Sequence, residues 1–370
     1  MDGTPYPSAG TSSRGLIFSE IARSPGSSRQ RLAARLGLVP ATVGTHVRTL
    51  VKHGFVQEGA PLTTTSGRPS IPLEPREDGG VLVGVSIERT GILAAAVTIA
   101  GEIADTQHVP IEPGGEIAGI VRAVDALRHA LHPRPVIAVG VTVSGVVDTT
   151  DGTVLISTVL GWHDYPLGAE LRKIIPLPVF VENDVIALAQ RELAFAPTVP
   201  DSFLLLHIGD GVGMAIVTAR SIVRGVRHGS IEFGHISTDP NGALCRCGNR
   251  GCVQTVFGYA ELNAGAPAGA LGASDMSQDA ATAAFLEDRS RELGRAVGSV
   301  STLLGIDHIR VSGRTTQYWA AIAEPLTASI ASSTPTLGAS PTVDVVAWTS
   351  AGVARGAAGV ALGSYLESLR

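Results

Sequence analysis

All three cysteines of the chain lie within eight positions, and a histidine precedes the first of them by ten residues. Cys245, Cys247 and Cys252 together with His235 offer three thiolates and one imidazole. Four ligands of these types form a closed tetrahedral set, which is typical of structural Zn²⁺ sites. Soft sulfur donors also favour zinc over Mg²⁺ or Ca²⁺. The pattern predicts one structural zinc ion per chain, against the alternative of three reduced, buried thiols.

The loop that carries these ligands also contains Gly248 and Gly251, which permit the tight backbone that closely spaced ligands need. Three cysteines do not pair into a disulfide framework. The first residues lack the basic-then-apolar pattern of a secretory signal, and no apolar run reaches the length of a transmembrane helix. We therefore expect a cytoplasmic protein with no membrane partner.

Charge divides the chain into a basic head and an acidic body. Residues 1–76 contain nine Lys and Arg against four Asp and Glu, a formal charge of +5, whereas the rest of the chain sums to −10. A chain of 370 residues is also long enough for two or three domains. The division predicts a nucleic-acid-binding domain at 1–76 and a larger body at 77–370. Charge alone does not separate this hypothesis from chance clustering.

Two amphipathic helices joined by a turn are predicted within residues 27–54. The first ends at Gly37, because glycine tolerates the left-handed conformation that follows many helices. Pro40 fits the first turn of the second helix, whose apolar residues recur at helical spacing: Val43, Val47, Leu50 and Val51. Residues 16–22 supply a third helix upstream. This spacing is typical of a helix-turn-helix.

Residues 55–75 are predicted to form two short strands around a turn, the wing of a winged helix-turn-helix. The turn carries Arg68, which is suited to enter a minor groove. The exposed face of the second helix offers candidate contacts to bases and phosphates: Thr42, Thr45, His46, Arg48, Thr49 and Lys52. The predicted partner is a double-stranded DNA operator, and the alternative is a three-helix module that binds protein.

The body alternates apolar strands with helices, which predicts an α/β fold in two lobes, about 81–190 and 191–370. Helices are expected at 184–194 and 280–305. Apolar strands are expected within five stretches: 79–105, 135–148, 177–184, 202–225 and 307–313. Residues 74–80 interrupt the apolar pattern and are predicted to link the head to the body.

Two stretches of the body resemble the ROK family of repressors, open reading frames and sugar kinases. They are EFGHISTDPNGALCRCGNRGC at 232–252 and the segment from VSGVVD to VENDV at 143–185. The resemblance covers roughly residues 81–370 and implies the two-lobed, actin-like and hexokinase-like fold. A helix-turn-helix before such a body is similar to the family's transcriptional repressors. We therefore expect a winged helix-turn-helix plus a two-lobed ROK domain, in a homodimer or homotetramer that matches palindromic half-sites.

The resemblance also implies a set of sugar contacts, in which the histidine is shared with the zinc site: Asn183, Asp184, Glu232, His235 and Gln254. Gln254 stands where the family has an acid, and Val159 stands where it has an asparagine, so the identity of the sugar is open. Asp184 matches the general base of the family's kinases. An acid at this position is also suited to cap a helix.

Three phosphate-binding turns of the family's kinases differ in this chain. The first carries Glu88 and Arg89, the second carries Asp210, and the third carries Arg314. Carboxylates near a polyanionic nucleotide oppose its binding, and phosphoryl transfer depends on Gly-rich turns, a metal and positive charge. Asp184 is therefore expected to be a vestigial base.

The sequence thus predicts a regulator of carbohydrate metabolism, a repressor rather than an enzyme, whose zinc-stabilised body senses a sugar or sugar derivative. Two alternatives stay open. One is an active, ATP-dependent, glucokinase-like sugar kinase with an appended DNA-binding domain. The other is a regulator whose body binds a partner protein and no sugar.

Overall fold

The computed structural model describes residues 13–62, 70–88, 91–209, 211–225, 231–265, 280–334, 340–349 and 351–369. The chain divides into two compact units. Unit 1 comprises Met1–Val199, Arg220–Ser230 and Ser350–Arg370, and unit 2 comprises Pro200–Ala219 and Ile231–Thr349. Unit 1 therefore contains the basic head, the first half of the body and the C-terminal helix.

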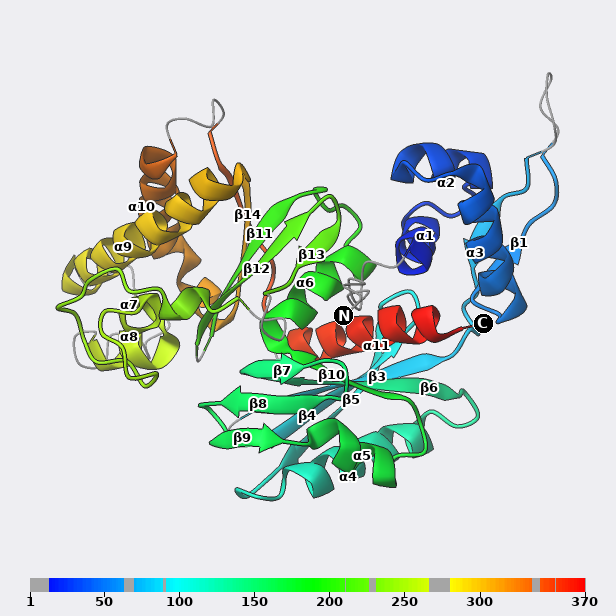
Figure 1. Cartoon of the computed structure of the whole chain (residues 1–370), viewed down its shortest axis with the longest axis horizontal. Coiled ribbons are helices and arrows are strands. Elements are labelled where there is room, and N and C mark those ends of the chain that lie inside the picture. The colour runs from blue at the N-terminus through cyan, green and yellow to red at the C-terminus, as the bar shows by residue number, and fades with distance from the viewer. Residues whose placement is uncertain are drawn as a thin grey trace, which may run out of the picture. The chain divides into compact units, whose positions relative to one another are not determined.

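The head of unit 1 is a winged helix-turn-helix (Figure 1), built from α1 (Ser13–Arg23), α2 (Arg29–Leu36), α3 (Pro40–Lys52), β1 (Val56–Glu58) and β2 (Leu73–Pro75). Ser28 caps α2, and Gly37 ends that helix in the predicted left-handed conformation, with φ of 65°. Pro40 begins α3 as predicted. The strands of the wing pair antiparallel, and its tip, which carries Arg68, lies outside the described residues.

The wing ends at Pro75 as predicted, but the predicted linker at 74–80 begins too early, because Glu74 and Pro75 belong to β2. The chain stays bound to the head for one more residue, since the Arg76 amide donates to Phe55 O at 3.0 Å. Arg76 then pairs with Asp78 through its guanidinium. The connection between head and body is therefore shorter than residues 74–80.

A five-stranded sheet in the order β10-β6-β3-β4-β5 forms the centre of unit 1. Its strands are β3 (Val81–Glu88), β4 (Gly91–Thr98), β5 (Ile103–Pro110), β6 (Val136–Val143) and β10 (Val179–Asn183). Strands β10, β6 and β3 are parallel, and β4 and β5 continue the sheet antiparallel. The other elements of unit 1 are a small sheet, β7 (Val146–Asp148), β8 (Thr153–Ser157) and β9 (Trp162–Tyr165), with α4 (Glu116–Ala130), α5 (Leu167–Ile174), α6 (Asp184–Phe195), β13 (Ser221–Val223) and α11 (Gly352–Ser368).

Helices lie on both faces of this sheet (Figure 1), which explains why β3, β4 and β6 are mostly apolar and buried, whereas the edge strand β5 is largely exposed. Val83 of β3 belongs to the core formed with α4, whereas Leu82 belongs to the core formed with α11. At two positions the sheet has no side chain and α11 lies directly on its backbone. A Cβ atom on Gly84 would lie 1.8 Å from Ala354 O, and one on Gly140 would lie 1.9 Å from Ala357 O.

The far end of α11 packs against the head. Leu362 and Leu366 of α11 share one hydrophobic core with Ile17 and Phe18 of α1. Arg14 of α1 donates hydrogen bonds to the carbonyl oxygens of Leu366 and Leu369, the latter at 2.7 Å. A cation at these carbonyls satisfies acceptors that the end of a helix leaves unpaired.

Unit 2 contains a sheet with the order β12-β11-β14-β15, made of β11 (Phe203–Ile208), β12 (Val212–Thr218), β14 (His308–Ser312) and β15 (Thr342–Val345). Leu204, Leu206 and Met214 of this sheet share a core with α9 and α10. The helices are η1 (Phe233–His235), α7 (Val253–Phe257), α8 (Tyr259–Gly265), α9 (Ala280–Leu304), η4 (Arg314–Tyr318) and α10 (Trp319–Ser333). The predicted strand at 307–313 and helix at 280–305 correspond to β14 and α9.

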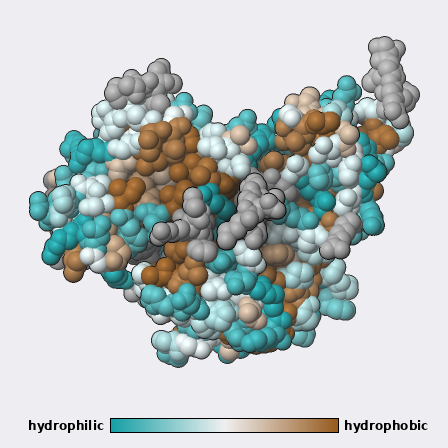
Figure 2. Space-filling view, in the orientation of Figure 1, coloured by the Kyte–Doolittle hydropathy of each residue, from teal (hydrophilic) through white to brown (hydrophobic). Residues whose placement is uncertain are grey.

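The visible face of the molecule mixes hydrophilic residues with apolar ones (Figure 2). Exposed apolar side chains include Leu244 in the cysteine loop and Leu303 near the end of α9, with exposed fractions of 66% and 82%. Among the described helices, none is long and apolar enough to cross a membrane.

The close approach of α11 makes a prediction about stability. Gly140→Ala should lower the free energy of unfolding by about 2–3 kcal/mol, because the new methyl group must displace the backbone of α11. Gly44→Ala is the control, since a Cβ there meets nothing within 4 Å and alanine favours a helix by up to about 1 kcal/mol. Chemical unfolding of the full chain, followed by circular dichroism, measures both. An unchanged midpoint for Gly140→Ala would show that α11 does not depend on this contact.

Candidate metal and effector sites

The four predicted metal ligands converge in unit 2. The ligand atoms of His235, Cys245, Cys247 and Cys252 all lie within 4.8 Å of one another. Cys245 Sγ is 3.5 Å from His235 Nδ1, and Cys247 Sγ is 3.7 Å from Cys252 Sγ. Sulfur atoms bound at about 2.3 Å to one tetrahedral ion stand about 3.8 Å apart. The observed separations fit this geometry, so the four side chains can hold a metal ion.

The backbone of the cysteine loop is folded tightly enough to need glycine. Gly248 and Gly251 have φ values of 91° and 60°, in the region that favours glycine. A Cβ on Gly251 would also lie 1.7 Å from Asp239 O. The Cys245 amide donates to Asn249 O at 2.7 Å and closes the turn. This backbone holds the thiols close together.

The thiols of the cluster differ in their tendency to ionise. Burial, together with the neighbouring thiols, raises the pKa of Cys252 to about 12. A hydrogen bond from the Asn249 amide lowers the pKa of Cys247. Without a cation the cluster therefore keeps a proton on Cys252. A bound metal ion supplies the positive charge that stabilises thiolates at such a site.

His235 presents its two ring nitrogens to different neighbours. Nδ1 faces Cys245 in the cluster, and Nε2 lies 3.8 Å from Glu232 Oε2. The turn η1 packs directly on the backbone of β12, because a Cβ on Gly234 would lie 2.0 Å from Val212 O. This close contact fixes the position of the turn. The side-chain oxygen of Gln254 lies beside the same glycine, 3.6 Å from that Cβ position. Glu232, His235 and Gln254, three of the predicted sugar contacts, are thus gathered around one rigid turn.

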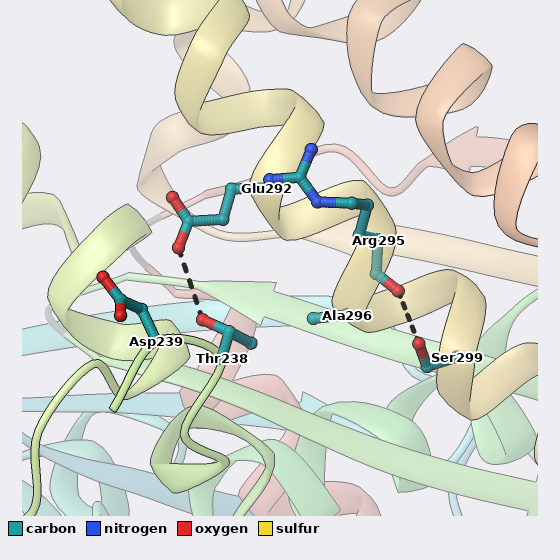
Figure 3. A pocket seen from close by; sticks show the side chains of 6 residues that line it. All are labelled: Thr238, Asp239, Glu292, Arg295, Ala296 and Ser299. Atoms are coloured by element: carbon teal, nitrogen blue, oxygen red, sulfur yellow. Dashed lines mark hydrogen bonds between the residues drawn. The ribbon is translucent and has the colours of Figure 1, made fainter. Parts of the chain in front are cut away.

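A hollow of about 440 Å³ lies where the cysteine loop meets α9 (Figure 3). Thr238 Oγ1 donates to Glu292 Oε1 across it at 3.3 Å, which fastens the loop to the helix. Its lining residues are Thr238, Asp239, Glu292, Arg295, Ala296 and Ser299. None of its polar side chains is buried, so the hollow is best explained as the joint between loop and helix.

Asn183 and Asp184, the other predicted sugar contacts, lie in unit 1 where β10 becomes α6. Asn183 Oδ1 accepts hydrogen bonds from the amides of Val185 and Ile186 at 2.9 and 3.1 Å, and its Nδ2 donates to Gly145 O at 2.9 Å. Asn183 therefore caps the helix. The sequence analysis had suggested this role for Asp184. Asp184 is the first residue of α6 and is half-buried.

A buried ion pair beside these residues was missed by the sequence analysis. The Glu182 side chain is 2% exposed, and its Oε2 accepts a hydrogen bond from Arg224 Nη2 at 2.6 Å. Its Oε1 accepts the amide of Asn183 at 2.9 Å. The only signal in the sequence is a glutamate at the end of an apolar strand, because its arginine partner is 42 residues away.

The DNA-binding candidates lie along α3. Thr45, Arg48 and Lys52 are exposed, and Arg48 Nη2 donates to Thr45 Oγ1 at 3.2 Å. His46 is half-buried, and its burial together with Arg14 lowers its pKa below the usual value. The neutral form of His46 is therefore favoured, and this side chain is less suited to bind a phosphate. Two further candidates, Thr42 and Thr49, are partly exposed.

The turns that differ from the kinase pattern are only partly described. Glu88 is exposed at the end of β3, whereas Arg89, Thr90 and Asp210 lie outside the described residues. Gly313 has a φ of 112°. The guanidinium carbon of Arg314 lies 5.8 Å from the ring centre of Trp348, so a cation–π contact holds this side chain.

Family models match almost the whole described chain. Residues 82–362 match the ROK family, and residues 13–57 match a winged helix-turn-helix DNA-binding model. The chain belongs to the ROK family. This ROK chain is 29% identical to the xylose repressor of Bacillus subtilis over 243 residues, which cover 64% of the chain and 63% of that repressor. The match thus spans less than two thirds of the repressor's length.

Solved ROK structures include both regulators and kinases. The ROK family transcriptional regulator described as a homolog of E. coli MLC protein has a TM-score of 0.78, 25% identity and 96% coverage of both chains. A ROK family glucokinase from Streptomyces griseus, in complex with glucose and AMPPNP, has a TM-score of 0.63 and 27% identity over 76% of this chain and 99% of that chain. The predicted fold class, a winged helix-turn-helix plus a ROK domain, is confirmed.

The cluster makes a prediction about metal content. Protein purified without chelator should contain about one equivalent of tetrahedral metal, and Cys247→Ser should lose most of it. The variant should also unfold at lower temperature, because metal binding contributes to folding free energy. Arg246→Ser is the matched control in the same loop. Elemental analysis and thermal unfolding measure both variants, and full metal retention by Cys247→Ser would disprove the site.

Proposed function

We propose that this ROK protein is a cytoplasmic transcriptional regulator of carbohydrate metabolism, a repressor that binds an operator through its winged helix-turn-helix. The observation that carries the proposal is the head itself. It places exposed Thr45, Arg48 and Lys52 along α3, the helix suited to a major groove. The xylose repressor match and the regulator structure that aligns over 96% of the chain support this assignment. A two-fold assembly, dimer or tetramer, would present two heads to a palindromic site.

Within this proposal the body binds a sugar or sugar derivative as effector. The predicted contacts are Asn183 and Asp184 in unit 1 and Glu232, His235 and Gln254 in unit 2. The uncharged Gln254 replaces an acid, which favours an effector different from that of the glucokinases. Asn183 acts chiefly by capping α6, since two backbone amides occupy its side-chain oxygen.

The metal of the cluster is proposed to be zinc, because three thiolates and one imidazole suit it best. His235 Nδ1, Cys245, Cys247 and Cys252 would hold the ion. The ion would supply positive charge that keeps the thiolates ionised. With Nδ1 on the metal, His235 Nε2 stays available to Glu232 or to a sugar hydroxyl. The site would therefore shape the turn that carries the sugar contacts, with no catalytic step of its own.

The glucokinase match supports a second candidate, an active sugar kinase with an added head. Glu88 at the end of β3 and the bulky Arg314 after Gly313 oppose it, because both replace features that bind nucleotide phosphates or adenosine in the family's kinases. Assays with ATP and glucose, N-acetylglucosamine, mannose, xylose or fructose decide the question. Turnover that Asp184→Asn abolishes would establish the kinase, and background rates with all five sugars support the regulator.

Operator binding should depend on the exposed face of α3. A selection from random duplexes with the full chain should return a preferred sequence. Arg48→Ala should weaken that binding and reduce the slope of log affinity against log salt by about one, because one phosphate contact is lost. Arg128→Ala, which removes a half-buried arginine of α4 that pairs with Asp125, is the control and should keep wild-type affinity. If no duplex is preferred over random DNA, the proposed function is wrong.

A further inference from the structure

A buried carboxylate of the head is surrounded by three arginines. Glu20 of α1 has a side chain that is only 1% exposed, and its oxygens lie 2.9 Å from Arg35 Nε and 3.1 Å from Arg220 Nη1. Arg23 Nη1 lies 3.7 Å away on the same helix. Arg35 belongs to α2, whereas Arg220 comes from the body. A buried carboxylate is stable only when such partners compensate for the lost water, so Glu20 requires α1, α2 and the body to stay together.

The body residue of this cluster begins a short segment that carries a second buried ion pair. Arg220 has a φ of 61°, which is unusual for a residue with a side chain. It precedes β13, and Arg224 follows that strand directly. Arg224 binds the buried Glu182, whose other oxygen accepts the amide of Asn183. Five residues therefore join the head cluster to the cap of α6.

The helix α6 forms a second connection between the same two places. Asn183 caps its N-terminus, Asp184 is its first residue, and its C-terminal end lies against the head. Arg23 Nε donates to Ala196 O at 2.9 Å, and the same guanidinium bonds Leu193 O. Helix α6 also contacts β13 directly. The proposed effector contacts of unit 1 and the head are thus linked by two rigid and mutually packed elements.

We propose that Arg220 and Arg224 are positioning residues that couple the effector contacts Asn183 and Asp184 to the DNA-binding head. Arg220 holds Glu20 of α1, and Arg224 holds Glu182 beside the helix cap. A shift at either end of β13 would disturb both ion pairs. Glu182 would be left buried without its arginine, and the buried Glu20 would lose one of its three arginine partners. This inference rests on the proposed function for its biological meaning. The contacts from which the coupling is inferred all lie within unit 1.

Hydrogen–deuterium exchange of the full chain tests the coupling without sugar or DNA. Arg224→Met removes the contact with Glu182 beside the cap of α6. If the two places are coupled, it should also accelerate exchange at the amides of α1 and α2 by at least about tenfold. Arg220→Met removes a contact of the head, yet it should accelerate exchange at the amides of Val185 and Ile186, at the other end of the connection, by a similar factor. Arg220→Lys keeps the charge and should restore most of the protection. A purely local structural role would change exchange only next to each substitution.

The matched control is Arg29→Met, which removes another arginine–glutamate pair of the head, with Glu58, and should leave exchange at α6 unchanged. If Arg224→Met does not fold, Glu182→Gln, which removes the charge and keeps the shape, provides the same comparison. The proposal would be overturned if Arg224→Met changed amide exchange only near the cap of α6 and Arg220→Met changed it only in the head. Because no effector or operator enters the experiment, this outcome is separate from a failure to find a preferred duplex, which would instead refute the proposed function.

Discussion

The direct contact between α11 and the backbone of the central sheet is the constraint on which unit 1 depends. Two glycines, Gly84 and Gly140, leave no side chain between the sheet and the helix, so α11 lies against β3 and β6 with its own small residues Ala354 and Ala357. Close packing of this kind allows only one position for the helix. The other half of α11 then presents Leu362 and Leu366 to the head. The position of the head on unit 1 is therefore set by the sheet, through one helix.

The DNA-binding head is packed firmly against the rest of unit 1. A head attached by a flexible linker would report little about the body, whereas here it shares a hydrophobic core with α11 and a buried ion cluster with Arg220. Arg14 and Arg23 each bond carbonyl oxygens at or just after the end of a body helix, α11 and α6 respectively. Burial of Arg23 lowers its pKa, which indicates that the junction excludes water. A regulator needs such a junction if a change in the body is to reach the operator.

Much of the fold could be predicted from local patterns. Gly37 and Pro40 marked the turn and the start of α3, and the grouping of Cys245, Cys247 and Cys252 with a histidine marked the metal cluster. The packing of α11 in unit 1 had no such signal, because the helix is apolar on most sides and its partners in the sheet and in α6 are more than 150 residues away. Nothing in the sequence distinguishes Glu20 and Glu182 from surface acids, and only the structure shows that they are buried. The role of Asn183 as a cap was likewise hidden, since Asn and Asp have similar capping preferences.

The measurement that tests the central claim most directly is the affinity of the full chain for its selected duplex, determined by fluorescence anisotropy with and without saturating sugar. Glucose, N-acetylglucosamine, mannose, xylose and fructose are the sugars to compare, together with thermal unfolding to show which of them bind. A sugar-responsive repressor should lose duplex affinity by about fivefold or more with a sugar that also raises the unfolding midpoint. Identical duplex affinity in the presence of every sugar that binds would contradict a link between effector and operator.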